Sequence, residues 1–346
     1  MSSRLITGAA TDTASKPAPS RRQALKVVAA AAGLPLLTIG AVRALAPKGE
    51  LVTWQGEALG AWSTLSLWHS DKAFARRTIA AMTAEVRRLE GILSLYEPES
   101  EISRLNRDGR LANPSRELVT LIGEAQKMSE ASAGAFDVTV QPLWTLYADH
   151  FAQNPETEEG PAAAALAAAD RLVDYRKVDV SRSSIAFAEK GMGITLNSLG
   201  QGAITDRVAE LLRNEGFEHA FIDLGEIRAI GGNPDGNPWR LGIEDPREPT
   251  RIARTVPLAD QAVAISGGYG TRFDRDGRFH HIFDPKTGLS AEGFLDVAVT
   301  GPRAAAANAL STALYVAGEG RAKAILAAYP GYSAEATRAD GTLVAL

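Results

Sequence analysis

Hydrophobic residues recur at helical spacing in several stretches of the chain, and the broadest stripe follows Asp71. The apolar positions that follow lie three or four residues apart, which predicts a helix. Asp71 or Ser70 is a suitable residue type to cap its N-terminus. Pro98 interrupts the pattern, and Ser100 is placed to cap a short second helix. The same spacing predicts further helices over residues 116–132, 203–214, 303–316 and 321–329.

Other stretches alternate apolar and polar residues with a period of two, which predicts strands. Residues 51–68 are expected to form one strand, in which Gly60 marks a bulge or a close approach of the backbone. Residues 221–232 and 239–243 are interpreted as the two strands of a β-hairpin whose loop contains Asn, Pro, Asp and Gly. Shorter strands are expected over 178–180, 184–187 and 295–300, and on both sides of Gly267-Gly268.

Two stretches lack a clear period. Residues 135–144 are expected to be extended and buried, with Asp137 as a turn or cap residue more readily than a ligand. Residues 154–169, rich in Pro, Glu and Ala, are expected to form a partly helical surface excursion without chemistry. Because helices and strands alternate irregularly and include hairpins, we expect an α+β fold rather than a doubly wound parallel sheet.

Composition and charge exclude some classes of protein. The 346 residues are 45% hydrophobic and 23% charged, which is typical of a globular protein of one large domain or two ordinary ones. The formal net charge is −4, and residues 1–46 hold six Lys or Arg and one acidic residue. The remainder therefore has 31 basic and 40 acidic residues and a net charge of −9, which argues against nucleic-acid binding.

The N-terminus is typical of an export signal. Arg21-Arg22 form a twin-arginine pattern, and the apolar stretch 27–39 is too short to favour a membrane span. We expect residues 1–46 to be the signal segment and 47–346 the exported domain, carried folded to the periplasm by the twin-arginine machinery. Ala44 and Ala46 offer an A-x-A cleavage site; cleavage after Ala44, or an uncleaved anchor, are alternatives. The absence of cysteine excludes disulfides and thiolate ligands.

Candidate chemistry is concentrated in residues 279–288. This segment holds His280 and His281, two of the five histidines, and Asp284 with a Pro-x-Thr-Gly turn. The pair is read either as strand-end residues that satisfy backbone groups or as a catalytic base with its neighbour. A glycine-rich stretch, 264–270, lies upstream, and downstream Asn308 and Thr312 share one helix face. The Gly-x-Gly at 191–193, ahead of a predicted helix, is a weak phosphate-binding signal.

Five blocks, within residues 95–106, 134–137, 199–206, 266–269 and 281–312, follow one another along the chain. Together they resemble the ApbE-type family of exported flavin transferases, which move FMN from FAD onto a Thr or Ser of a target protein. The resemblance runs from about Gly56 to Thr312. Within the family the chain is most similar to the NosX branch, associated with the flavoprotein NosR and maturation of nitrous oxide reductase. The blocks are Leu95-Tyr96 with 100–106, Gly134-Ala135-Phe136-Asp137, Leu199-Gly200-Gln201-Gly202 with Asp206, Ser266-Gly267 with Tyr269, and His281-Ile282-x-Asp284-Pro285-x-Thr287-Gly288 followed by Asn308 and Thr312.

The resemblance implies a two-lobed fold of mixed or antiparallel sheets with flanking helices and with FAD in the cleft between the lobes. It also implies Mg²⁺, an acceptor flavoprotein domain similar to NosR, and His281 as the catalytic base or its essential partner. Residues implied to line FAD are Leu59, Tyr96, Ala135, Phe136, Asp137, Thr195, Gln201 and Ile282. Residues implied to hold the metal are Ser198, through its carbonyl, Asn308, Ser311 and Thr312.

The chain departs from the family pattern at several of these positions. Family members usually carry Asp at position 308 and commonly Lys at 201, where this chain has Asn308 and Gln201. Thr195 and Ile265 replace a usual Asp and Thr. Fewer acidic ligands weaken binding of a hard cation. The departures therefore leave open an FAD carrier or assembly scaffold with little transferase activity. A periplasmic solute-binding protein without flavin is a third reading, but it leaves the His281 block unexplained.

Overall fold

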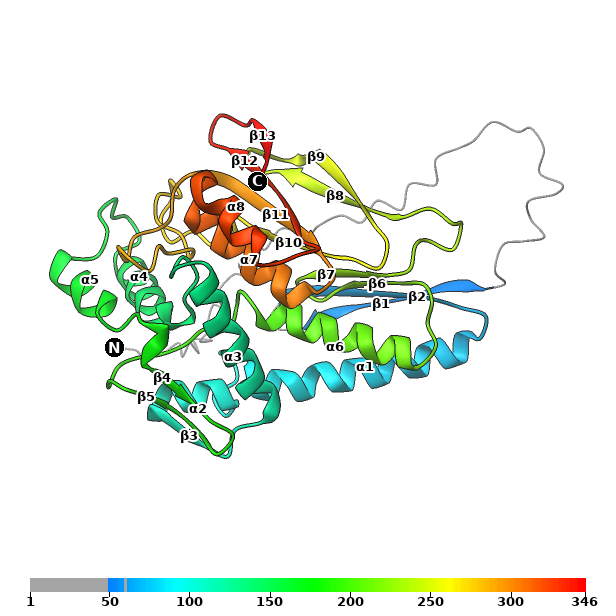
Figure 1. Ribbon diagram of the computed structural model, residues 1–346, viewed down its shortest axis with the longest axis horizontal. Coiled ribbons are helices and arrows are strands. Elements are labelled where there is room, and N and C mark those ends of the chain that lie inside the picture. Colours follow the sequence, from blue (N-terminus) through cyan, green and yellow to red (C-terminus); the bar gives the residue numbers. More distant parts are fainter. Residues whose placement is uncertain (1–48, 59–60) are drawn as a thin grey trace, which may run out of the picture.

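The computed structural model describes residues 49–58 and 61–346, and its centre is an eight-stranded antiparallel sheet (Figure 1). The expected signal segment and Leu59 lie outside the described residues. Every neighbouring pair in this sheet is antiparallel. In spatial order the strands are β1 (Glu50–Ala58), β2 (Ala61–His69), β6 (Ala220–Asp223), β7 (Ile227–Ile230), β10 (Ala262–Ser266), β11 (Phe294–Gly301), β12 (Ser333–Arg338) and β13 (Leu343–Ala345).

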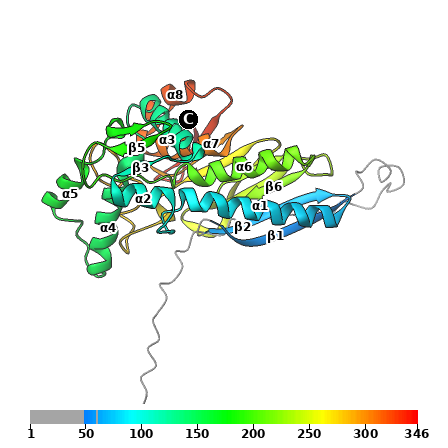
Figure 2. The ribbon, with the colours of Figure 1, turned by 90° about the horizontal axis from the view of Figure 1, so that it is seen from below.

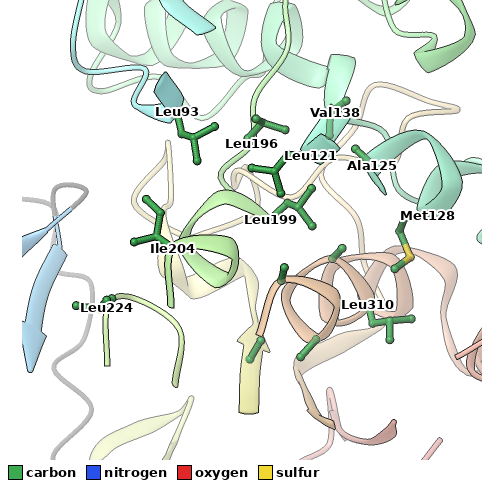
Figure 3. Close-up of a cluster of buried hydrophobic side chains, with 14 of the residues drawn as sticks. Leu93, Leu121, Ala125, Met128, Val138, Leu196, Leu199, Ile204, Leu224 and Leu310 are labelled. Atoms are coloured by element: carbon green, nitrogen blue, oxygen red, sulfur yellow. The ribbon is translucent and has the colours of Figure 1, made fainter. Parts of the chain in front are cut away.

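Helices cover one face of this sheet. Figure 2 shows α1 (Lys72–Leu93) and α6 (Gly200–Asn214) side by side along β1, β2 and β6. The next helix, α7 (Ala304–Ala317), packs on β10 and β11, and α8 (Glu319–Ala327) follows it. Side chains from α1, α6 and α7 meet in one hydrophobic core, part of which is drawn in Figure 3 with Leu93, Ile204 and Leu310.

The longest helix shows why the hydrophobic pattern predicted these elements well. Asp71 caps α1, because its Oδ1 accepts hydrogen bonds from the N–H groups of Ala73 and Phe74. Burial of each large apolar side chain on this face of α1 contributes roughly 1.5–3 kcal/mol to the stability of the fold. The buried residues are Ala75, Thr78, Ile79, Met82, Val86, Leu89, Ile92 and Leu93.

A hairpin, β8 (Trp239–Asp245) and β9 (Glu248–Leu258), covers the opposite face of the central sheet. Successive residues of a strand point to opposite faces. Phe221 accordingly packs against Leu241 and Leu258 of the hairpin, whereas Ala220 and Ile222 belong to the helix-covered core.

The remaining elements form a helical part beside the central sheet, at the left of Figure 1. It contains α2 (Glu101–Asp108), α3 (Arg116–Ala131), α4 (Gln141–Gln153) and α5 (Ala163–Asp170). A small antiparallel sheet completes it, with the order β3 (Arg110–Ala112), β5 (Ser184–Phe187), β4 (Val178–Val180). The expected α+β class, with antiparallel sheets and flanking helices, is confirmed. No helix in the described part of the chain combines the length and apolar character needed to cross a membrane.

Two predicted strand patterns were wrong. Residues 51–68 fall into two strands, β1 and β2, which pair antiparallel with Ala58 opposite Ala61. The hairpin predicted from 221–232 with 239–243 is also wrong. Gly225 adopts φ = +93° and breaks the first segment into β6 and β7, which pair with each other.

Three other predictions need correction. Residues 135–144 are not extended: a 3₁₀ turn over Val138–Val140 leads into α4, where Pro142 occupies a position that favours helix initiation. No strand follows Gly268 before β11; residues 271–293 form a loop with two isolated bridges. The helix predicted over 203–214 begins three residues earlier, at Gly200.

One buried carboxylate joins α6, α7 and the central sheet. Asp206 of α6 accepts hydrogen bonds from the N–H groups of Ala304 (2.8 Å) and Ala305 (3.1 Å) at the start of α7, and it pairs with Arg228 of β7. Arg303, the N-cap residue of α7, supplies no side-chain hydrogen bond to the helix. Asp206 therefore satisfies amide groups that every helix leaves without a partner at its N-terminus.

The strand before the β6–β7 turn ends in a half-buried carboxyl group, that of Asp223. Oδ1 of Asp223 accepts a hydrogen bond from the N–H of Gly225 at 3.3 Å. Burial raises the pKa of the Asp223 carboxyl group to about 6, and this hydrogen bond only partly opposes the shift.

Replacing Asp206 with Ala should lower the free energy of unfolding by about 3–5 kcal/mol, because it leaves Arg228 buried without its counter-charge. Urea denaturation of the mature domain measures this loss. Glu124→Gln is the matched control, since it removes a partly exposed partner of Arg303 and should cost less than about 1 kcal/mol. Equal losses in the two variants would contradict the anchoring role of Asp206.

Replacing Asp223 with Asn should stabilise the protein at pH 8. The folded state holds a proton on Asp223 that the unfolded state releases, so stability falls as pH rises from about 4 to 6. An amide keeps the oxygen acceptor but removes this effect. The free energy of unfolding of the variant should exceed that of the native chain by about 1–3 kcal/mol at pH 8 and by nothing below about pH 4. A difference that does not change with pH would contradict the raised pKa.

Candidate functional site

A cavity of about 240 Å³ lies where the central sheet meets the helical part. Its walls come from the end of β10, the start of α6, the middle of α7, the β6–β7 turn and the loop that contains His281. Segments separated by more than a hundred residues therefore converge on one space.

Ten of the residues singled out from the sequence line this cavity. They are Ala135, Phe136, Asp137, Thr195, Ser198, Gln201, His281, Ile282, Asn308 and Thr312. Leu59 lies outside the described residues. Tyr96 and Ser311 do not line the cavity itself, and their positions are described below.

Tyr96 lies beside a smaller hollow that adjoins the cavity. Tyr96 is 70% exposed and is therefore not a core residue. The hollow is lined by Tyr96 together with Asn197 and Gln201, and these two residues also line the main cavity. Tyr96 is therefore placed to contact a ligand that extends out of the cavity.

Asp137 serves as a cap, as the sequence suggested. Its Oδ1 accepts hydrogen bonds from the N–H and the hydroxyl of Thr139, and its Oδ2 accepts from the N–H of Tyr175. Burial raises the pKa of the carboxyl group, and these hydrogen bonds oppose that effect. The residue ties one wall of the cavity to the segment before β4.

The two adjacent histidines have different environments. His280 is buried: its Nε2 donates to the carbonyl of Ala291 at 3.0 Å, and its Nδ1 accepts from the N–H of Ile282 at 3.3 Å. Burial lowers the pKa of His280, which keeps the imidazole neutral. His280 therefore satisfies backbone groups, which was one of the two readings of the pair.

His281 faces the cavity. Its Nδ1 donates a hydrogen bond to the carbonyl of Thr271 at 3.1 Å, so the neutral ring carries its lone pair on Nε2. Gly270 lies against the ring, because a Cβ atom at this position would come within 3.2 Å of Cε1 of His281. In this tautomer Nε2 is the ring nitrogen that can accept a proton.

Aromatic packing fixes the loop that carries His281. Tyr147 and Phe151 of α4 contact Phe279 and Phe283, with ring centroids 5.1–5.9 Å apart. Phe273 packs against the same rings. Each aromatic pair at such a distance contributes about 0.5–1.5 kcal/mol to stability beyond the effect of its buried area. The loop is thus held by α4 rather than by strand pairing.

Polar oxygens line the α7 wall of the cavity. The hydroxyl of Ser266 lies 2.8 Å from Oγ of Ser311 and 3.1 Å from Oγ1 of Thr312. Ser311 is buried and donates to the carbonyl of Asn308 at 2.9 Å, so it supports the wall from behind. The amide of Asn308 donates from Nδ2 to Oε1 of Glu226 at 2.5 Å.

Ser266, Glu226 and Glu244 also line the cavity, although the sequence analysis assigned them no role in the site. Ser266 begins the Ser-Gly-x-Tyr block, and this block was a usable signal. Glu226 carried no recognisable sequence signal, because it lay within a segment predicted to be a strand. The Gly-x-Gly at 191–193, a weak phosphate-binding signal in the sequence, lines a separate groove and does not enter α6, which begins at Gly200.

The donor atoms suit a hard cation with few protein ligands. Among residues 49–58 and 61–346, no group of three or more His, Asp or Glu is arranged to hold a metal. Asn308, Thr312, Ser198 and Glu226 line the same cavity, and their amide, hydroxyl, carbonyl and carboxylate oxygens are of the type that hard cations prefer.

Comparison with known proteins gives consistent matches. The ApbE family model matches residues 59–335. The FAD:protein FMN transferase of Haemophilus influenzae is 30% identical over 263 residues, which cover 73% of this chain and 76% of that protein. The enzyme of the same name from Treponema pallidum is 31% identical over 269 residues, covering 71% and 72%.

Solved structures agree with the family match. Flavin Transferase ApbE from Vibrio cholerae superposes with a TM-score of 0.74 at 26% identity and covers 86% of this chain and 97% of that one. The ApbE protein of Thermotoga maritima gives a TM-score of 0.75 at 27% identity, with the same coverage. The match extends over most of the sequence and of the fold, and this chain therefore belongs to the ApbE family.

Proposed function

We propose that the chain is an FAD:protein FMN transferase that attaches FMN to a Thr or Ser of an acceptor protein. The observation that carries the proposal is the convergence of His281, with its lone pair on Nε2, and the polar wall of α7 in one cavity. Transfer from a pyrophosphate needs both groups: oxygen ligands for a cation that neutralises its negative charge, and a base for the incoming hydroxyl.

The reaction makes one bond and breaks one. The acceptor hydroxyl oxygen attacks the phosphorus that bears the riboflavin chain, and the bond from this phosphorus to the bridging oxygen breaks, so that AMP leaves. Nε2 of His281 takes the hydroxyl proton. The hydrogen bond from Nδ1 to the carbonyl of Thr271 stabilises the resulting imidazolium.

The remaining cavity residues suit binding of FAD. Phe136 and Ile282 offer apolar surface, and the exposed ring of Tyr96 lies at the adjoining hollow. Asn308, Thr312 and the carbonyl of Ser198 would hold Mg²⁺. Bound there, the ion would neutralise charge on the pyrophosphate.

We further propose that the protein acts in the periplasm. The twin-arginine pattern at Arg21-Arg22 supports folded export, with residues 1–46 as signal and 47–346 as the transferase domain. A membrane-associated acceptor similar to NosR, and a role in nitrous oxide reductase maturation, follow from the resemblance to the NosX branch.

The direct test supplies FAD, Mg²⁺ and a Thr-containing acceptor domain to the mature protein. AMP and a covalently fluorescent acceptor should form, and His281→Ala should slow transfer by about 10²-fold or more while FAD stays bound. His280→Ala should reduce transfer much less per folded molecule, because His280 contacts backbone groups. Bound FAD without AMP release by the native chain would favour the carrier function instead.

Tyr96→Ala should weaken FAD binding by about 5-fold or more, since ring stacking contributes roughly 1 kcal/mol beyond buried area. Fluorescence quenching measures the affinity. Tyr329→Ala is a control that removes an aromatic ring remote from the cavity lining, and it should leave FAD affinity unchanged. An unaltered affinity in Tyr96→Ala would remove Tyr96 from the flavin site.

A further inference from the structure

The β6–β7 turn places Glu226 against Asn308 in the wall of the cavity. Nδ2 of Asn308 lies 2.5 Å from Oε1 of Glu226, and both residues line the cavity. Asn308 is 4% exposed and Glu226 is half-buried, so the contact is partly shielded from bulk water. A hydrogen bond to a carboxylate is shorter and about twice as strong as one between neutral groups.

This contact determines how the amide of Asn308 is oriented. An ionised carboxylate only accepts hydrogen bonds, so the amide presents its nitrogen to Glu226. The amide oxygen is thereby directed away from Glu226. Thr312 lies one helical turn further along the same face of α7 and also lines the cavity.

The backbone of Glu226 is held in place by α6 and by its own turn. Its carbonyl accepts hydrogen bonds from Oγ1 of Thr205 and from the N–H of Leu224, both at 3.2 Å. The preceding Gly225 lies against Gln201, because a Cβ atom there would come within 2.6 Å of the Gln201 amide nitrogen. A carboxylate on a turn fixed in this way is preorganised for a ligand.

We infer that Glu226 is the charged group of the cation site, supplying the negative charge that Asn308 lacks and orienting the amide oxygen of Asn308. The inference rests on the proposed function, in which this wall faces the pyrophosphate and its Mg²⁺. Hard-cation affinity rises with ligand charge. The amide at position 308 then does not impair the site. A carboxylate at this position would lie next to the carboxylate of Glu226, and the two charges would repel each other when no cation is bound.

Binding of Mn²⁺ to the mature protein saturated with FAD tests the inference, with free Mn²⁺ measured by electron paramagnetic resonance. Glu226→Gln should weaken Mn²⁺ binding about 10-fold or more, the loss typical for groups that bind or orient metal ligands. Asn308→Asp should tighten it. The double variant exchanges the carboxylate and the amide, and it should return to within about 3-fold of the native affinity.

Two controls separate a local role from general electrostatics and from misfolding. Glu210→Gln removes the same charge from an exposed position on α6 and should leave Mn²⁺ affinity within about 2-fold. Circular dichroism and FAD affinity without metal should stay near native values in Glu226→Gln. A purely structural Glu226 would change these two readouts and not the Mn²⁺ affinity of the folded, FAD-bound protein.

Unchanged Mn²⁺ affinity in Glu226→Gln, with FAD bound normally, would overturn this inference and leave the proposed function intact. A double variant that binds Mn²⁺ as weakly as Glu226→Gln would also overturn it, because the charge would then not be exchangeable between the two positions. A native chain that binds no FAD would contradict the proposed function, and this inference with it.

Discussion

The N-terminus of α7 depends on a carboxylate from another helix. Asp206 accepts hydrogen bonds from the backbone N–H groups of Ala304 and Ala305 and forms an ion pair with Arg228 of the central sheet. Gly202 allows this approach, because a Cβ atom at that position would lie 2.5 Å from the carbonyl of Ala304. Asp206 thus joins α6, α7 and β7 at one point, and this contact fixes the position of α7 along and around its axis. Asn308 and Thr312 face the cavity only in this register.

Another wall of the cavity, the loop that carries His281, is held by a different kind of contact. The loop carrying His281 has almost no strand pairing, so packing of Phe279 and Phe283 on α4 holds it instead. His280 fills a buried position behind it and satisfies backbone groups. Two walls are therefore built independently, one by hydrogen bonds to a buried charge and one by aromatic contacts. Their meeting creates the cavity.

Much of the helical structure could be predicted from the sequence, because long apolar stripes with caps such as Asp71 and Ser100 carry a strong local signal. Strand pairing was harder. Whether 51–68 is one strand or two depends on a reversal that alternation alone does not encode, and Gly225 divides another apparent strand. Residues 135–144 looked extended, although Leu143, Tyr147 and Phe151, four residues apart, mark the buried face of α4.

The residues of the cavity also fall into those that the sequence predicted and those that it did not. The family resemblance selected ten of the residues that line the cavity. It did not identify Glu226, whose importance comes from a contact across 82 positions of sequence with Asn308. Contacts between distant segments are set by tertiary packing, and no local pattern records them. For the same reason the sequence singled out the amide at 308 as a departure but not its partner.

A crystal structure of the mature protein with FAD and Mn²⁺ tests the central claim most directly, because anomalous scattering locates the ion. The anomalous peak should lie between the FAD pyrophosphate and the α7 face formed by Asn308 and Thr312, with the imidazole of His281 facing the phosphorus that bears riboflavin. FAD bound outside this cavity, or an ion held away from α7, would contradict the assignment of the site.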